Sequence, residues 1–173
     1  EVPGIEVNTG ALGHGLSIGV GMSIAAKMDK KDYKTYVLMG DGEQGEGSIY
    51  EAAMAASHYK LDNLVAIIDR NHLQISGNTE NVMSLDSIRD RWTAFGWDVK
   101  EMNGDEIEDI VATFNGIDYS NNRPHLLISN TTKGKGVSYM ENVAKWHHGV
   151  PSAEQYETAI KEISERIAQL ENN

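Results

Sequence analysis

Residues 35–47 have the sequence TYVLMGDGEQGEG, an apolar run that ends in a glycine-rich turn. The run 35–39 predicts a buried strand, and Gly40-Asp41-Gly42 predicts a sharp turn at its carboxyl end. Similar patterns predict strands at 64–68, 98–102 and 126–129 and helices at 12–28, 48–59, 85–95, 105–114 and from 152 onward. Strands that alternate with helices are typical of a parallel sheet. We therefore expect an α/β fold, a parallel sheet with helices on both faces.

The composition limits the classes of function. The chain has 173 residues, 40% of them hydrophobic, which suits one α/β domain. Its net charge of −11 disfavours nucleic acid and anionic membranes as partners. Cysteine is absent, which excludes disulfides and thiolate metal ligands. No apolar run approaches the roughly 20 residues that span a bilayer, so we expect no membrane contact and a cytoplasmic protein.

Two polar residues follow neighbouring predicted strands. Asp41 follows the first strand, and Asn71 follows the second, 30 residues later. A right-handed crossover places two such strand ends side by side, and ligands of open α/β sheets bind at that edge. Gly-Asp-Gly alone is more often an ordinary turn. Asn71 changes this interpretation. The Asp41 carboxylate, the Asn71 amide oxygen, a nearby backbone carbonyl and phosphate oxygens could together complete the ligand shell of Mg²⁺.

Several segments resemble one family. Gly40-Asp41-Gly42 followed after 28 residues by Asn71 resembles the thiamine-diphosphate signature. The surrounding segments resemble transketolase: TGALGHGL at 9–16, HYKLDNL at 58–64, DRNHLQISG at 69–77, RWTAFGW at 91–97 and TKGKG at 132–136. The resemblance covers nearly the whole chain. It implies that 1–173 form the diphosphate- and magnesium-binding domain, with the thiamine-diphosphate-binding fold.

The resemblance also implies roles for individual residues. Mg²⁺, or Ca²⁺ as a substitute, would be bound by the side chains of Asp41 and Asn71 and by the carbonyl of Leu73. The positions implied in binding thiamine diphosphate are Gly10, Ala11, Leu12, Gly42, Asn71, Ile75, Lys133 and His147. Ala11 stands where many relatives have Pro or Ser. An ordinary solvated loop lysine remains an equal alternative for Lys133.

Two catalytic candidates follow from the same resemblance. The segment Trp146-His147-His148-Gly149 matches the late active-site histidine. Counting from Gly136 selects His147, whereas counting back from Pro151 selects His148, and we favour His147. A neutral histidine there could donate a hydrogen bond to diphosphate or substrate and relay protons. Glu46 resembles a carboxylate at the dimer interface; alternatively it is an exposed acid at a helix start.

The resemblance also concerns what lies outside these residues. The sequence begins without an initiator Met, so we expect a truncated N-terminus, and we expect the pyrimidine-binding and C-terminal domains on another polypeptide. The simplest interpretation is one subunit of a split transketolase of the pentose phosphate pathway, inactive alone, with sugar phosphates and a companion subunit as partners. The alternatives are a subunit of another thiamine-diphosphate enzyme and a non-catalytic assembly piece.

Small residues in 12–28 indicate close packing. Gly15 and Gly19 share one face of this helix, and Ser17 and Gly21 share another. We expect self-association through this helix and 48–59, with Gly19 sensitive to substitution.

Overall fold

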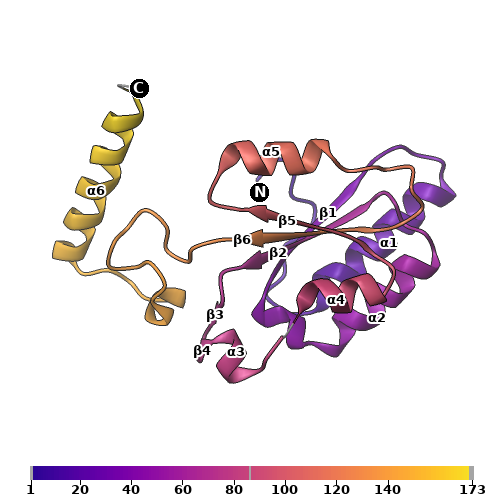
Figure 1. The fold of residues 1–173 in the computed structure, drawn as a ribbon, viewed down its shortest axis with the longest axis horizontal. Coiled ribbons are helices and arrows are strands. Elements are labelled where there is room, and N and C mark those ends of the chain that lie inside the picture. The colour runs from indigo at the N-terminus through magenta and orange to yellow at the C-terminus, as the bar shows by residue number, and fades with distance from the viewer. Residues whose placement is uncertain (1, 86, 172–173) are drawn as a thin grey trace.

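The computed structural model describes residues 2–85 and 87–171, which form a parallel sheet with flanking helices (Figure 1). The sheet has the strand order β1-β2-β6-β5. Its strands are β1 (Thr35–Gly40), β2 (Leu64–Arg70), β5 (Asp98–Asn103) and β6 (His125–Asn130). The helices are α1 (His14–Met28), α2 (Gly47–His58), α3 (Thr79–Val82), α4 (Ile88–Ala94), α5 (Ile107–Asn115) and α6 (Ala153–Glu171). The predicted fold class is confirmed.

All neighbouring strands of this sheet run parallel. In the register of β1 and β2, Gly40 pairs with Asp69, so the two strands end at the same edge. The expected juxtaposition of the segments after β1 and β2 is therefore confirmed. Continuous apolar sequence in β2 and β6 is explained by burial from both sides, because these are the two central strands.

Helices cover the two faces unequally (Figure 1). One face packs against α1, α2 and α4, and its core includes the edge-to-face pair Trp92 and Trp97. The other face carries a smaller core under α5. Beside α5, β1 leaves Tyr36 and Leu38 exposed by 50% and 72%. Helices thus lie on both faces, as predicted, but the cover over β1 is incomplete on the α5 side.

The first helix begins two residues later than predicted, at His14. Gly13 precedes it with a φ of 82°, a conformation that glycine adopts without strain. A Cβ atom on Gly13 would lie 2.4 Å from Ser48 Oγ. The glycine is thus required both by the turn and by the close approach of the segment that starts α2.

Several short elements were not predicted. They are the 3₁₀ helices η1 (Gly42–Gly45) and η2 (Ala144–His147), the two-residue strands β3 (Leu73–Gln74) and β4 (Gly77–Asn78), and α3. None is long enough to show a hydrophobic period, which is why pattern analysis misses them. Most of them lie at the carboxyl edge of the sheet, where they shape the site.

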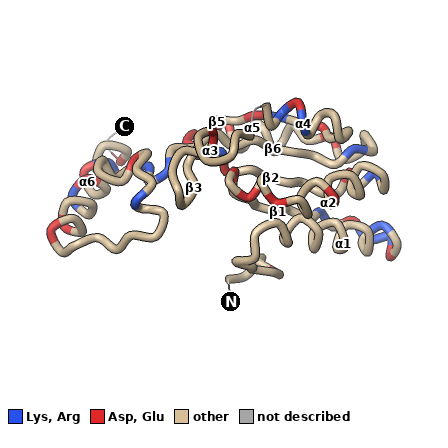
Figure 2. The backbone as a smooth tube through the Cα atoms, turned by 90° about the horizontal axis from the view of Figure 1, so that it is seen from below, with Lys and Arg blue, Asp and Glu red and all other residues tan. Residues whose placement is uncertain are grey.

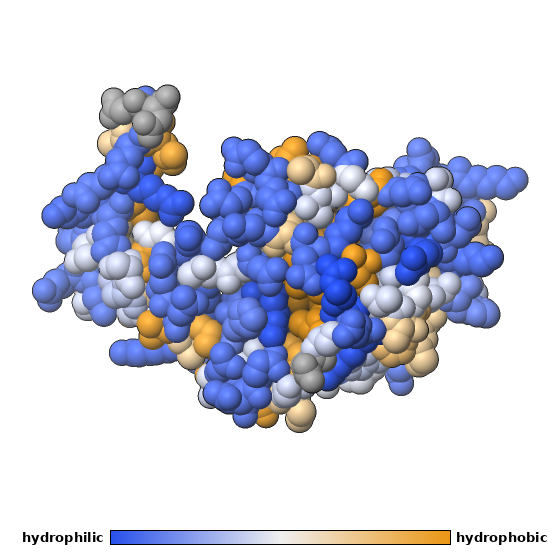
Figure 3. Space-filling model, viewed as in Figure 1, coloured by the Kyte–Doolittle hydropathy of each residue, from blue (hydrophilic) through white to orange (hydrophobic). Residues whose placement is uncertain are grey.

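The last helix, α6, stands apart from the sheet, beyond the edge where the parallel strands end (Figure 1). Apolar surface is visible along it in Figure 3. Exposed apolar side chains recur along it at Tyr156, Ile160, Ile163, Ile167 and Leu170. The chain reaches α6 through the long segment that contains η2.

The small residues of α1 have two different environments. A Cβ atom on Gly19 would lie 2.4 Å from Val37 Cγ2, and one on Gly15 would lie 3.6 Å from Val37 Cγ1. This face therefore packs on the chain's own β1 and is not an exposed association surface. The other small pair, Ser17 and Gly21, is exposed. Self-association stays a prediction, but Gly19 is not part of a surface that could mediate it.

Candidate functional site

Asp41 is the first residue beyond β1, and it is buried, with 1% of its surface exposed. Its Oδ1 accepts the Gly42 N–H at 2.7 Å. Its Oδ2 accepts the His72 N–H at 2.7 Å and Arg70 Nη1 at 3.1 Å. A carboxylate offers about four lone-pair positions, so one remains for a cation. These donors hold the side chain of Asp41 in one orientation.

Asn71 lies just beyond β2, the neighbouring strand, and is also buried. Its Nδ2 donates to Asp69 Oδ2 at 3.1 Å, and its Oδ1 accepts the Leu73 N–H at 3.0 Å. The Asp69 carbonyl in turn accepts the Asp41 N–H at 3.2 Å. The amide oxygen of Asn71 keeps a second lone pair for a metal ion.

The oxygen-bearing groups at this edge are of the kinds that bind Mg²⁺ together with a phosphate ligand. Mg²⁺ prefers one or two protein carboxylates together with substrate phosphates. Asp41 supplies the carboxylate, Asn71 an amide oxygen and Leu73 a carbonyl two residues further on. Within residues 2–85 and 87–171, no group of three or more His, Asp or Glu side chains is arranged to hold a metal ion. A carboxylate, an amide oxygen and a carbonyl would leave coordination positions of Mg²⁺ for phosphate oxygens.

A turn before α1 is fastened to the same edge. Glu43 Oε1 accepts the Gly13 N–H at 2.8 Å, and Glu43 Oε2 accepts the Gly40 N–H at 3.1 Å. Ser48 Oγ donates to the Gly13 carbonyl at 3.0 Å. The exposed residues 10–12, predicted to line a cofactor, are therefore held beside the Gly40-Asp41-Gly42 turn. Sequence analysis missed Glu43, although an acid directly after this turn was a visible signal.

Gly42 and Ile75 lie at the β3–β4 hairpin. A Cβ atom on Gly42 would lie 3.1 Å from Gln74 Cβ, so the glycine allows β3 to approach. The Gly42 N–H, predicted to approach a diphosphate, is satisfied here by Asp41. Ile75 follows β3 with 66% of its surface exposed, as an apolar contact for a ligand requires.

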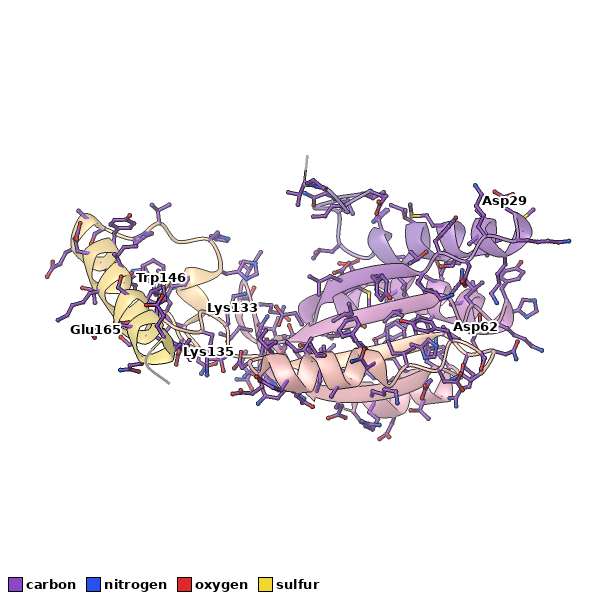
Figure 4. All side chains as sticks on the ribbon, turned by 90° about the horizontal axis from the view of Figure 1, so that it is seen from above. Asp29, Asp62, Lys133, Lys135, Trp146 and Glu165 are labelled. Carbon is purple, nitrogen blue, oxygen red and sulfur yellow. The ribbon has the colours of Figure 1, made fainter. Side chains whose placement is uncertain are left out.

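His147 and Lys133 both belong to the segment between β6 and α6. η2, which ends at His147, lies against β3. Partial burial, together with the charges of Lys133 and His148, lowers the pKa of His147. Figure 4 places Lys133 and Lys135 in the loop between the sheet and α6. Figure 2 shows basic segments there, although the chain as a whole is acidic.

The two adjacent histidines are both exposed, and their rings lie 5.6 Å apart at an angle of 85°. The charge of Lys133 contributes to the lowered pKa of His147. A histidine kept neutral beside a lysine retains one nitrogen that donates and one that accepts a hydrogen bond.

Glu46 is exposed and occupies the position directly before α2. Its side chain makes no capping hydrogen bond to that helix within the described residues. Its Cβ lies beside Gly13, at 2.8 Å from where a Cβ of that glycine would stand. Its carboxylate is therefore available at the surface next to the N-terminal turn.

Among the described residues, no helix is both long enough and apolar enough to cross a membrane.

These features define a class of protein: an open parallel α/β sheet with buried polar residues at the carboxyl ends of its strands, the edge at which such sheets bind their ligands. Residues 1–166 match the family model described as transketolase, thiamine diphosphate binding domain. The chain belongs to this family.

Relatives support the same assignment. An apulose-4-phosphate transketolase subunit from Phocaeicola vulgatus is 82% identical over 171 residues, which are 99% of this chain and 61% of that protein. The subunit of the same name from Actinobacillus succinogenes is 48% identical over 95% of this chain and 59% of its own length. A 6-deoxy-6-sulfo-D-fructose transketolase subunit from a Clostridium species is 38% identical over 95% of this chain and 60% of its own length.

Solved transketolase structures have the same fold. A transketolase from Campylobacter jejuni superposes with a TM-score of 0.76 at 28% identity, over 98% of this chain and 32% of that one. A transketolase variant from Pichia stipitis superposes with a TM-score of 0.75 at 30% identity, over 99% of this chain and 30% of that one. The chain thus spans about 60% of its curated subunit relatives and about 30% of these enzymes.

Proposed function

We propose that this chain belongs to a thiamine-diphosphate- and Mg²⁺-dependent transketolase that moves a two-carbon ketol unit from a ketose phosphate to an aldose phosphate. The observation that carries the proposal is the placement of Asp41 and Asn71 beyond adjacent strands, in a chain of the transketolase family. Thiamine diphosphate, when bound, supplies the carbanion stabilisation on which carbon–carbon bond cleavage depends.

The chain's own residues would hold the cofactor. Asp41, Asn71 and Leu73 would bind the metal through oxygen atoms, and Ca²⁺ could replace Mg²⁺ because both are hard cations. Gly42 would turn its backbone N–H from Asp41 toward the diphosphate. The cofactor would further contact Gly10, Ala11, Leu12, Ile75, Lys133 and His147.

His147 would act from η2, which lies against β3. Its lowered pKa favours the neutral imidazole at neutral pH. In that state it would donate one hydrogen bond to a phosphate or substrate oxygen and accept or return a proton. Lys133 would offer a positive charge to the same oxygen atoms.

A companion subunit would complete the active site. Relatives that are themselves named as transketolase subunits support such a division. The companion would carry the pyrimidine-binding and C-terminal domains, including the glutamate that activates the cofactor. Glu46 would lie at the interface with the second chain, where its exposed carboxylate could link two sites. The chain alone would therefore be inactive.

The substrate proposal rests on the strong identity to one relative. The protein that is 82% identical is named for apulose 4-phosphate. We therefore propose apulose 4-phosphate as the donor, in place of the pentose phosphate pathway sugars that the family resemblance first suggested.

The test is an assay of the full chain together with its companion subunit. Apulose 4-phosphate, xylulose 5-phosphate and 6-deoxy-6-sulfo-D-fructose are compared as donors with an aldose phosphate acceptor. We expect transfer from apulose 4-phosphate that requires both subunits, thiamine diphosphate and Mg²⁺. Decarboxylation of 2-oxo acids without ketol transfer would indicate another thiamine-diphosphate enzyme. Full assembly without cofactor binding would indicate a non-catalytic piece.

A further inference from the structure

Arg70 ends β2 directly before Asn71, and its guanidinium donates to Asp41, the other residue that would bind the metal through its side chain. The Arg70 side chain is only 12% exposed. Burying a guanidinium lowers the stability of the folded chain unless charged and polar groups surround it. Its partners therefore show what the residue does.

The guanidinium bridges two segments that are distant in sequence. Nη1 donates to Asp41 Oδ2 at 3.1 Å and to Thr79 Oγ1 at 3.0 Å. Nη2 lies 2.5 Å from Glu80 Oε1. Arg70 thus binds both the carboxylate beyond β1 and the start of α3, and Nη1 alone contacts the two segments.

The segment that contains α3 is held together by its own hydrogen bonds. Glu80 Oε2 accepts the Ser84 hydroxyl at 2.7 Å and the Leu85 N–H at 3.1 Å. The Thr79 N–H donates to the His72 carbonyl at 2.9 Å. Residues 72–85 are therefore one fastened segment, and they include Leu73.

The same segment touches Asp41 a second time, because the His72 N–H donates to Asp41 Oδ2 at 2.7 Å. Arg70 and His72 thus meet at one oxygen of Asp41 from neighbouring positions. One positive charge between two carboxylates also leaves a net negative charge for a cation.

We propose that Arg70 is a positioning residue for the metal site, which fixes the Asp41 carboxylate and the Leu73 segment relative to each other before the metal and diphosphate bind. The inference rests on the proposed function and adds a residue to it. Groups that hold metal ligands in place commonly change metal affinity by about 10–100-fold when they are removed.

The test measures Mg²⁺ affinity at saturating thiamine diphosphate by calorimetry, on the full chain with its companion subunit. We expect Arg70→Met to weaken Mg²⁺ binding by at least about tenfold. Arg70→Lys should recover only part of that affinity. Lysine keeps the positive charge, but one ammonium group cannot bind Asp41 and Glu80 at once as the planar guanidinium does. Glu80→Gln should cause a smaller loss. With Mn²⁺ as probe, the electron paramagnetic resonance spectrum of Arg70→Met should broaden relative to the wild type.

Arg89→Met is the matched control, because Arg89 pairs with Glu101 at the surface with 46% and 44% of the side chains exposed. It should bind Mg²⁺ as the wild type does. Folding of each variant is checked by near-ultraviolet circular dichroism. If Arg70→Met does not fold, Arg70→Lys and Glu80→Gln decide, since each breaks only part of the bridge.

Wild-type or tighter Mg²⁺ affinity in the folded Arg70 variants would overturn the inference, and tighter binding would mean that Arg70 competes with the metal. A wild-type protein that shows no Mg²⁺-dependent binding would instead overturn the proposed function itself.

Discussion

Glu43 Oε1 lies 2.8 Å from the amide nitrogen of Gly13, a residue 30 positions earlier in the chain. The second oxygen of the same carboxylate accepts the Gly40 N–H. One side chain therefore joins the turn before α1 to the end of β1. The two backbone segments proposed to line the cofactor are held together by a residue that does not itself need to touch it.

We expect Glu43→Ala to lower the free energy of unfolding by about 1–3 kcal/mol, because two backbone N–H groups lose their acceptor. Glu43→Gln should lie between the wild type and the alanine variant. Urea denaturation of the full chain measures both. Glu51→Ala, an exposed position on α2, is the control. Equal stability of the two alanine variants would show that Glu43 does not fasten the turn.

Asp41→Ala should abolish Mg²⁺-dependent binding of thiamine diphosphate, because the diphosphate loses a charged metal ligand beside it. It also removes one of the two carboxylates that pair with Arg70, which costs about 1–3 kcal/mol, while Thr79 and Glu80 still accept hydrogen bonds from the guanidinium. Asp41→Asn keeps the shape and separates the two effects. Calorimetric titration is the measurement, and Asp32→Ala, at a side chain that is 97% exposed, is the control. Unchanged affinity in a folded Asp41 variant would rule out the metal assignment.

The glycines of α1 offer a matched pair. A Cβ on Gly19 meets Val37, whose branched side chain has little freedom to move, whereas a Cβ on Gly21 meets nothing within 4 Å. We expect Gly19→Ala to destabilise the chain by about 1–3 kcal/mol. Gly21→Ala should stabilise it by up to about 1 kcal/mol, because alanine favours helix. Thermal unfolding checks both.

The same pair tests self-association. Light scattering over a concentration series should give the same molar mass for the folded Gly19→Ala variant as for the wild type. Any difference should come only from a smaller amount of folded protein. A concentration-dependent change in mass caused by Gly19→Ala in a fully folded sample would contradict the packing of Gly19 on β1.

Glu80 should contribute to the pH dependence of the unfolding free energy at acidic pH. The Ser84 hydroxyl and the Arg70 guanidinium lower the pKa of Glu80 to about 2, from an ordinary value of 4.5. Because the folded pKa is the lower one, this stabilisation is present above about pH 4.5 and is lost as the pH falls toward 2. Glu80→Gln should therefore flatten the dependence of the unfolding free energy on pH in this window. Urea denaturation from pH 2 to pH 7 measures it, with Glu51→Gln as control. An unchanged slope would show that Glu80 is not held in its charged form.

Much of the site could be anticipated from local sequence. Asp41 and Asn71 each follow an apolar run, and parallel strands joined by a helix end at one edge, so their proximity follows from the pattern. The hairpin of β3 and β4 could not be anticipated in this way, because two-residue strands have no measurable period. The start of α1 was misplaced for a related reason, since the turn at Gly13 depends on Ser48 and Glu46, which are more than 30 residues away.

By itself, the sequence determined the order of the elements, the parallel sheet and the family. These follow from hydrophobic periodicity and from glycine and acid spacing, which are properties of neighbouring residues. Only the tertiary structure decided that Arg70 bridges Asp41 to Glu80 and that Gly19 faces Val37. The reason is physical: a side chain takes as partner whichever group the fold brings within about 3 Å, and segments far apart in the chain supply those groups.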